Sequence, residues 1–241
     1  MRKIAIFVEG QTELIVVREY LLRWFNYSDI EIECRTLFIE GKFHSAEYDY
    51  PTPNPQFHFQ IINVGNDNAV LSRMLKREQY MWSAGYEKII GLRDMYSKEY
   101  RDMSAVISNE VNDLFNIARI EVINNRASKP DKIKMCFAVM ETEAWFLGLH
   151  EALEKIHAEL TNDFIFDKLG IDLEKIDPEK EVFHPASLLE KIYGLVGEKY
   201  QKHKGDIEAL TYHFDRETIE ILLQRDKCNS FNVFHEAIHS D

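Results

Sequence analysis

The sequence contains few cysteines and no long apolar run. Its three cysteines, Cys34, Cys136 and Cys228, are far apart and odd in number, which matches neither a disulfide framework nor a zinc site of paired cysteines. Two of them lie in apolar, strand-like runs, and we expect small buried hydrophobes. No stretch of about eighteen uncharged apolar residues is present. We therefore expect neither a membrane span nor a signal peptide, and predict a cytoplasmic protein.

The sequence also lacks the glycine-rich loops that hold phosphate groups. Neither GxGxxG nor GxxxxGK[ST] occurs, so a nucleotide-binding α/β protein has little support. Positive charge is scarce, because 29 Lys and Arg stand against 41 Asp and Glu, for a formal net charge of −12. This disfavours a broad basic surface for nucleic acid. It does not exclude a nuclease, since cations offset metal-binding carboxylates and a partner can supply the basic surface.

The chain does have enough apolar residues for a sizeable core. With 241 residues, 45% of them hydrophobic, it can form one large domain or a core with a smaller appendage. The opening predicts a strand over residues 3–8, a helix over 12–25 and a strand over 30–35. Strand, helix, strand is the opening of an α/β fold.

The rest of the chain predicts further strands, then helices alone. Strands are expected over 58–64, 87–92 and 132–140, and helices between them over 66–85 and 104–124. Three prolines in 41–57 predict an excursion, either a hairpin or a binding loop. After residue 141 we expect helices over 143–157, 161–168, 186–193, 207–212, 215–224 and 231–239. The sequence thus predicts a mostly parallel sheet flanked by helices, in a core over 1–146, with a helical C-terminal portion over 147–241 packed on or beside it.

Three predicted strands are followed by acidic residues. Glu9 follows the first strand, Asp94 follows the KIIGL strand, and Glu141 and Glu143 follow the last strand. Because binding sites form beyond the carboxyl ends of parallel strands, these acids are expected at one edge of the sheet. Carboxylates gathered there repel one another, and a hard divalent cation such as Mg²⁺ or Mn²⁺ explains their joint presence best.

Each acid also has a simpler explanation. Glu13 and Glu143 could favour the positive N-terminal ends of their helices, and Asp94 could be a turn or cap residue. Glu9 is harder to explain by packing, because it ends a buried strand and Gly10 turns the chain directly after it. We interpret the four coincidences together as one site.

These motifs resemble those of the Toprim fold, found in topoisomerases, bacterial primases and nucleases of the OLD type (overcoming lysogenisation defect). The sequence has VEGQTE at 8–13, DMY at 94–96 and ETEAW at 141–145. The same order makes it similar to the Toprim-like family called domain of unknown function 4276. The resemblance covers residues 3–146 and implies a Toprim-like, Rossmann-like fold. It departs at Tyr96, where many Toprim enzymes have a second aspartate, so that Glu141 or Glu143 would have to substitute.

The resemblance implies a metal-dependent nuclease that cuts DNA or RNA with Mg²⁺ or Mn²⁺. Glu9 would be a metal ligand or general base, and a cation would face the scissile phosphate, with Lys202, Lys204 and Arg93 as candidates. The expected catalytic residues are Glu9, Asp94, Glu141 and Lys202. The expected metal ligands are Glu9, Glu13, Asp94, Glu141 and Glu143.

The resemblance also implies a biological setting. Similar families are often encoded beside an ABC-type or AAA-type ATPase and act in defence against phages, so we expect such a partner, with a homo-oligomer possible. The alternative is an inactive Toprim-like regulatory or binding subunit that docks a partner protein. Tyr96 in place of an aspartate is the best support for that alternative.

Two other groups of side chains attract attention. His235 and His239 are one helical turn apart, a spacing that can bind zinc, but no HExxH motif or cysteine supports a zinc site. Aromatic residues in and after the proline-rich excursion could stack on unpaired bases or bury their rings against the domain. These aromatic residues are Tyr48, Tyr50, Phe57 and Phe59.

Overall fold

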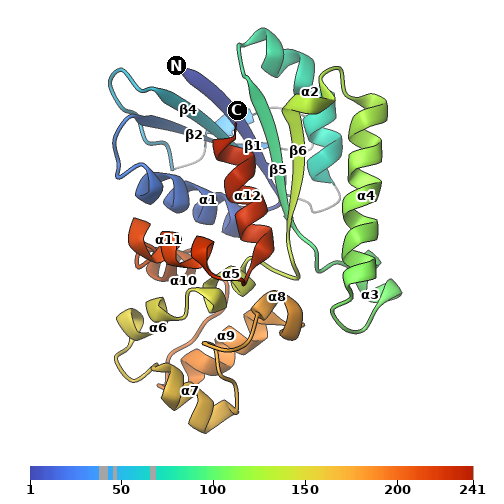
Figure 1. Cartoon of the computed structure of the whole chain (residues 1–241). Helices are drawn as coiled ribbons and strands as arrows, with labels where there is room; N and C mark the ends of the chain where they lie inside the picture. The colour runs from blue at the N-terminus through green and yellow to red at the C-terminus, as the bar shows by residue number, and fades with distance from the viewer. Residues whose placement is uncertain (38–42, 46–47, 66–68, 241) are drawn as a thin grey trace.

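A six-stranded sheet forms the centre of the protein, with strand order β3-β2-β4-β1-β5-β6 (Figure 1). The computed structural model describes residues 1–37, 43–45, 48–65 and 69–240. The strands are β1 (Arg2–Val8), β2 (Ile30–Leu37), β3 (Phe43–Ser45), β4 (Phe57–Asn63), β5 (Lys88–Asp94) and β6 (Ile133–Ala138). Five are parallel and β3 is antiparallel to β2.

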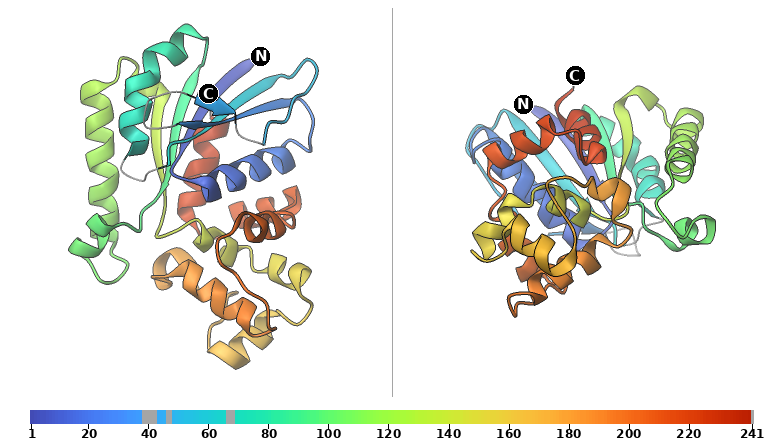
Figure 2. Two further views of the ribbon diagram at one scale, coloured as in Figure 1. Left: turned by 180° about the vertical axis from the view of Figure 1, so that it is seen from behind. Right: turned by 60° about the horizontal axis from the view of Figure 1, so that its bottom comes forward.

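Helices cover both faces of this sheet (Figure 2). Those of the first part of the chain are α1 (Gln11–Trp24), α2 (Val70–Ser83), α3 (Lys98–Met103) and α4 (Asn109–Arg126), followed by the short 3₁₀ helix η2 (Pro130–Lys132). Those of the second part are α5 (Glu143–Gly148), α6 (Glu151–Ile156), α7 (Asn162–Leu169), α8 (Pro178–Glu181), α9 (Pro185–Gly194), α10 (Lys204–Thr211), α11 (Arg216–Gln224) and α12 (Asn229–His239). The predicted α/β class, with a mostly parallel sheet and a helical C-terminal portion, is confirmed.

The alternation of side chains along β1 explains the two helical layers. Ile4 and Ile6 belong to a core shared with α1 and α12, whereas Ala5 and Phe7 pack with α2 on the other face. The helix α1, which follows β1, lies on the first face. The helix α4, which follows β5 after α3, contacts α2 and so lies on the second face. The boundary between β1 and β5 is thus a topological switch point, where parallel α/β sheets form binding crevices.

One apolar core joins the two halves of the chain. It runs from Ile4 in β1 through Trp145 in α5 to Ile238 in α12. The helix α12 packs on β5 and β6, and α10 packs on α1. The boundary expected after residue 146 falls inside α5, so core and C-terminal portion share buried side chains rather than meeting at a linker.

Polar contacts fix α12 to the sheet and to α1. The buried Lys88 ammonium donates to the carbonyl of Ala237 at 2.9 Å and to both oxygens of Ser240, which satisfies carbonyls at the helix C-terminus. The Tyr20 hydroxyl contacts His235 Nδ1 at 2.7 Å and His239 Nε2 at 2.8 Å. Since a hydroxyl carries one proton, it donates to one ring and accepts from the other. The histidine pair therefore has a packing role in this structure.

Several local expectations need correction. The helix expected over 143–157 is two helices, because Arg225 Nη1 donates to the Gly148 carbonyl at 3.1 Å while the Ala152 amide bonds to Leu149 instead. A Cβ on Gly148 would also lie 2.6 Å from Cys228 Sγ, so the glycine permits the close approach of α12. The segment between the strand expected over 87–92 and the helix expected over 104–124 contains α3, which the Ser97 hydroxyl caps.

The excursion is partly described. Its residues 41–42 and 46–47 lie outside the described part, as do residues 66–68 of the helix expected over 66–85. Phe43–Ser45 forms β3, and Tyr50 bridges to Ile32. Phe59 is fully buried, and Tyr48 donates to Glu208 at 2.9 Å. These rings thus pack against the domain.

All three cysteines are buried, as predicted. None of the described helices is long and apolar enough to cross a membrane.

Replacing Lys88 with methionine tests the anchoring of α12. We expect Lys88→Met to lower the free energy of unfolding by about 2 kcal/mol, because hydrogen bonds from a charged donor are lost. Urea unfolding measures the change, and hydrogen exchange of residues 229–239 should accelerate. The matched control is Lys134→Met, which alters an exposed lysine on the neighbouring strand. Equal stability of the two variants would refute the anchoring role.

The histidine pair should make stability depend on pH. Burial, followed by the charges of His235, Lys88, Arg2 and Arg216, lowers the pKa of His239 to about 4. The unfolded state then binds more protons, so this contribution is complete above about pH 6.5 and is lost as the pH falls towards 4. We expect His239→Gln to flatten the pH dependence of the urea midpoint in this range. An unchanged slope in His239→Gln contradicts the assignment.

Candidate metal centre

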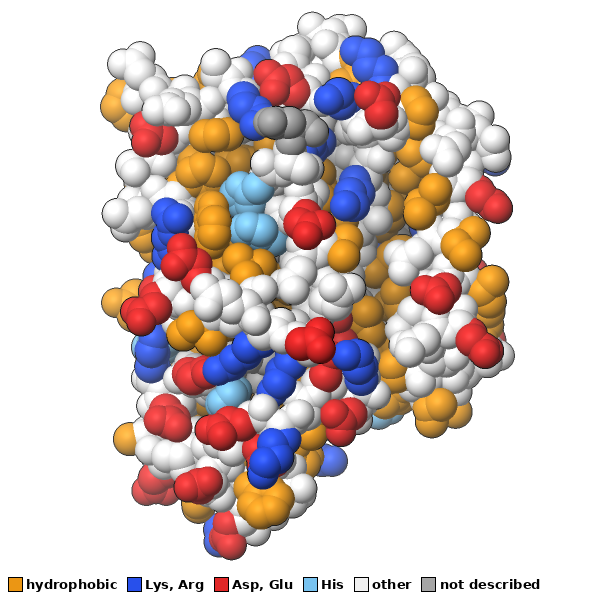
Figure 3. Space-filling view, in the orientation of Figure 1, with side chains coloured by type: hydrophobic (Ala, Val, Ile, Leu, Met, Phe, Trp, Pro, Cys, Tyr) orange, Lys and Arg blue, Asp and Glu red, His pale blue; other side chains and the backbone are white. Residues whose placement is uncertain are grey.

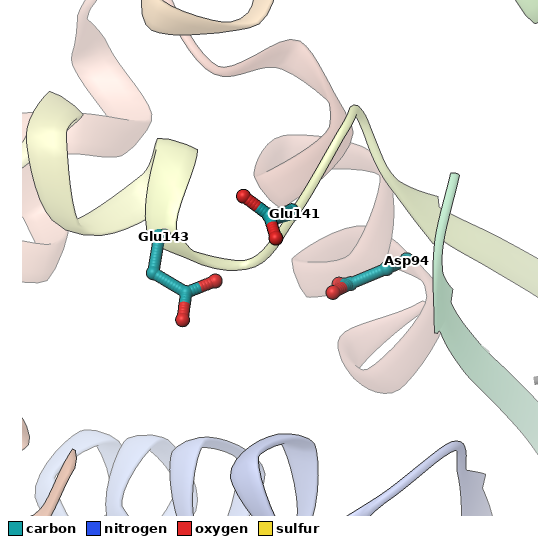
Figure 4. Close-up of side chains that lie close together, drawn as sticks. All are labelled: Asp94, Glu141 and Glu143. Carbon is teal, nitrogen blue, oxygen red and sulfur yellow. The ribbon is translucent and has the colours of Figure 1, made fainter. Parts of the chain in front are cut away.

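Acidic side chains from the ends of β1, β5 and β6 meet at the C-terminal edge of the sheet. Asp94, Glu141 and Glu143 each offer one carboxylate oxygen, and these oxygens all lie within 4.8 Å of one another. Figure 4 shows the three side chains turned towards a common space between α5 and the end of β5. The parallel register of β5 and β6, with Asp94 opposite Ala138, brings the three residues to this edge.

Backbone amides hold three of the carboxylates in place. Asp94 Oδ1 accepts from the Thr142 amide at 3.0 Å, and Glu9 Oε2 accepts from the Asp94 amide at 3.2 Å. Glu141 Oε2 accepts from the Ala186 amide at 3.0 Å, in the first turn of α9, where the positive end of the helix favours a negative charge. Each bond leaves other lone pairs of its carboxylate available for a ligand.

Glu13 is a further, buried acid next to this group. It lies in the first turn of α1 and is almost completely buried. Its Oε2 accepts from the Gly10 amide at 2.8 Å, so the residue caps its own helix, as the simpler explanation predicted. It is also close enough to Glu9, Asp94 and Glu143 for their charges to interact. Glu13 thus caps its helix and also lies among the acids, while its expected role as a metal ligand stays a prediction.

A lysine from the C-terminal portion lies among these acids. Lys202 Nζ is 2.9 Å from Glu141 Oε1 and 3.1 Å from Glu143 Oε2. Glu143 is fully buried, and its Oε1 accepts from the Tyr200 hydroxyl at 2.8 Å. The Lys202 ammonium thus forms ion pairs with two of the three carboxylates, those of Glu141 and Glu143. The tyrosine was missed from the sequence, because no spacing links residue 200 to residue 143.

The backbone is strained on both sides of the group. Met140, directly before Glu141, has φ +61°, and Lys202 has φ +56°. Residues other than glycine rarely adopt this left-handed backbone conformation. It costs about 1–3 kcal/mol and is concentrated at functional sites. The two partners of the Lys202–Glu141 ion pair thus lie at or directly after a residue with a left-handed backbone.

The electrostatics of the group favour an added cation. Burial, followed by the charge of Glu9, raises the pKa of Glu13 to about 7. Burial and the charges of Glu13, Glu143 and Glu9 raise the pKa of Asp94 well above its ordinary value, and burial raises that of Glu143. Burial opposes the charge of Lys202, but Glu143, Asp94 and Glu141 raise its pKa. One ammonium does not balance five carboxyl groups, and an all-oxygen donor set suits Mg²⁺ or Mn²⁺.

The structure thus brings together all six residues expected at the site: Glu9, Glu13, Asp94, Glu141, Glu143 and Lys202. The other two candidate cations lie elsewhere. Lys204 Nζ lies 4.6 Å from the Tyr48 ring centroid. Arg93 contributes to a pocket between α2 and α4 instead.

Tyr96 adds no carboxylate at the position where many Toprim enzymes carry one. Its ring packs on Phe183 and His184, with centroids 5.7 and 5.2 Å away, and its hydroxyl accepts from Arg101 at 3.2 Å. Glu141 and Glu143 are the carboxylates that lie next to Asp94 instead.

Removing the ammonium should destabilise the metal-free protein. We expect Lys202→Met to lower the free energy of unfolding in EDTA by about 2 kcal/mol, less than for a fully buried pair because Lys202 is partly exposed. When Glu143 is already replaced by Gln, Lys202→Met should lower the free energy of unfolding by less, because it no longer leaves the Glu143 carboxylate without a cation. Urea unfolding of the wild type and three variants measures the coupling. Strictly additive losses would show that the two residues do not interact.

Comparisons with family models, curated proteins and solved structures find no match for this chain. The resemblance to Toprim proteins therefore stays a prediction from the sequence motifs.

Proposed function

We propose that the chain is a metal-dependent nuclease of the Toprim type that hydrolyses phosphodiester bonds of DNA or RNA. The observation that carries the proposal is the cluster of Asp94, Glu141 and Glu143, with their oxygens within 4.8 Å and Lys202 beside them. The cluster lies next to a topological switch point, where α/β folds bind ligands. Acids with strongly perturbed pKa values are typical of active sites.

The residues divide into ligands and positioning groups. Asp94, Glu141 and Glu143 would hold Mg²⁺ or Mn²⁺, and Glu9 and Glu13 complete the negative charge around them. The bound cation would supply charge stabilisation for phosphodiester hydrolysis. Glu9, held by the Asp94 amide, is the candidate general base. Lys202 is the candidate for stabilising negative charge on the phosphate, and the Tyr200 hydroxyl orients Glu143.

One observation favours the alternative of a catalytically inactive regulatory or binding subunit. Lys202 already neutralises Glu141 and Glu143 at 2.9 and 3.1 Å, so the acids have a cation without any metal. In that case they would stabilise the joint between the core and the C-terminal portion. A nuclease requires Lys202 to share these carboxylates with a metal ion.

The proposed setting is the cytoplasm, in prokaryotic defence against phages with an ABC-type or AAA-type ATPase partner. A surface feature supports a partner or a second copy. The side chains of Leu114, Ile117 and Ile120 are 51–55% exposed along α4, and hydrophobic side chains are visible on this helix in Figure 3. Apolar groups gathered on a surface often mark interaction sites.

Replacing a central ligand tests the metal site. We expect Mn²⁺ to raise the melting temperature of the wild type, because binding to the folded state alone stabilises it. Asp94→Asn can still accept from the Thr142 amide, so it should melt as the wild type does in EDTA but lose the Mn²⁺-dependent increase. Calorimetric titration with Mn²⁺ gives the affinity, and cleavage of plasmid DNA and of RNA gives the activity.

The control is Asp163→Asn, which changes an exposed acid in the first turn of α7. It should keep both the metal response and the cleavage. A wild type that binds no Mn²⁺ would sink the nuclease proposal. If the wild type binds Mn²⁺ but, like Asp94→Asn, cleaves neither DNA nor RNA, the result favours the regulatory or binding subunit.

A further inference from the structure

A second pocket lies between α2 and α4, away from the acidic cluster. Its volume is about 260 Å³. Arg93 contributes from β5, while Arg119 and Arg126 contribute from α4. Arg93 is the residue before Asp94, and successive side chains of a strand point to opposite faces of the sheet. The pocket therefore belongs to the face that α2 covers, and the acids belong to the edge.

The pocket concentrates positive charge in a protein of net charge −12. Three of its lining side chains are arginines, and none of the described residues that line it is acidic. Arg119 has an ion pair with Glu99 at 3.5 Å. Arg126 makes no hydrogen bond or ion pair with any residue in the described part of the chain. Among the described residues that line the pocket, an anion would therefore meet three arginines and no carboxylate.

Arg93 gives the pocket a fixed, buried donor. Its side chain is 2% exposed, its Nε donates to the Asp94 carbonyl at 3.1 Å, and its guanidinium lies 5.7 Å from the centroid of the Phe137 ring. A guanidinium held in this way is preorganised, so little side-chain entropy is lost when a ligand binds. In a site shielded from water its attraction for an anion is also stronger.

The remaining walls are apolar. Leu71 and Leu75 come from α2, Val122 from α4 and Met135 from β6. Arginine forks match the geometry of phosphate oxygens, and aliphatic side chains suit the flat apolar part of a ligand. The volume is just below the range of about 300–1,000 Å³ usual for small-molecule pockets. A ligand of about the size of a mononucleotide suits this volume.

We propose that this pocket binds a small phosphate-bearing molecule, of the class of nucleoside monophosphates, through Arg93, Arg119 and Arg126. The phosphate pairs with the guanidinium groups, and the rest of the ligand packs against Leu71, Leu75 and Met135. This proposal does not depend on the nuclease proposal. It does give the chain a route for regulation, because Arg93 bonds the backbone of Asp94.

Titration calorimetry in EDTA tests the pocket without involving the metal centre. The probes are the four nucleoside monophosphates, inorganic pyrophosphate as the anion alone and adenosine as the apolar part alone. We expect at least one monophosphate to bind tighter than both pyrophosphate and adenosine. Arg126→Gln and Arg119→Gln should each weaken that binding by about tenfold, because a charge-assisted contact to phosphate is lost.

The control is Arg216→Gln, an exposed arginine of α11, which should bind as the wild type does. Urea midpoints within error of the wild type show that Arg119→Gln and Arg126→Gln are folded. No binding of any monophosphate overturns the proposal, as does equal binding of pyrophosphate and the monophosphates. Unchanged affinity in both arginine variants, with binding retained in the wild type, places the ligand elsewhere and overturns it too.

Discussion

Mutual repulsion among buried carboxylates is the constraint on which this structure depends. Glu13 and Glu143 are almost fully buried, and Asp94 and Glu9 stand at adjacent strand ends. The charges of Glu9, Glu13 and Glu143 each raise the pKa of a neighbouring carboxyl group. Such a group is unfavourable unless protons or cations neutralise it. The fold accepts this cost at one edge of the sheet, where amides of Gly10, Asp94, Thr142 and Ala186 compensate part of it.

The second half of the chain completes this edge. Lys202, Tyr200 and the Ala186 amide all come from beyond residue 146, and each contacts Glu141 or Glu143. The Toprim-like motifs lie in the first 146 residues, so they contain the acids but not the groups that position them. One apolar core runs from β1 to α12 and attaches to the sheet the helical portion that carries these groups.

The succession of strands and helices along the chain and the gathering of the acids could be predicted from sequence, because both follow from local patterns. Period-two alternation identified β2, and Glu9, Asp94 and Glu141 stand directly at strand ends, where parallel topology brings them together. Contacts between distant segments could not be predicted. The break after Gly148 depends on the hydrogen bond from Arg225 to the Gly148 carbonyl. The pairing of Tyr200 with Glu143 depends on the path of the chain between two residues that are 57 positions apart in the sequence. The periodicity of apolar residues along a helix predicts neither of these two contacts.

The neighbouring residues Arg93 and Asp94 show how the sheet keeps opposite charges apart. A direct pair between them would neutralise both, but alternation along β5 sends the guanidinium towards α2 and α4 and leaves the carboxylate at the strand end. The acids then gather on one side and the arginines on the other, in a chain whose charge is negative overall. The two groups remain joined by the hydrogen bond from Arg93 Nε to the Asp94 carbonyl. If an occupant of the pocket shifts the Arg93 side chain, this hydrogen bond is the contact through which the shift would reach Asp94.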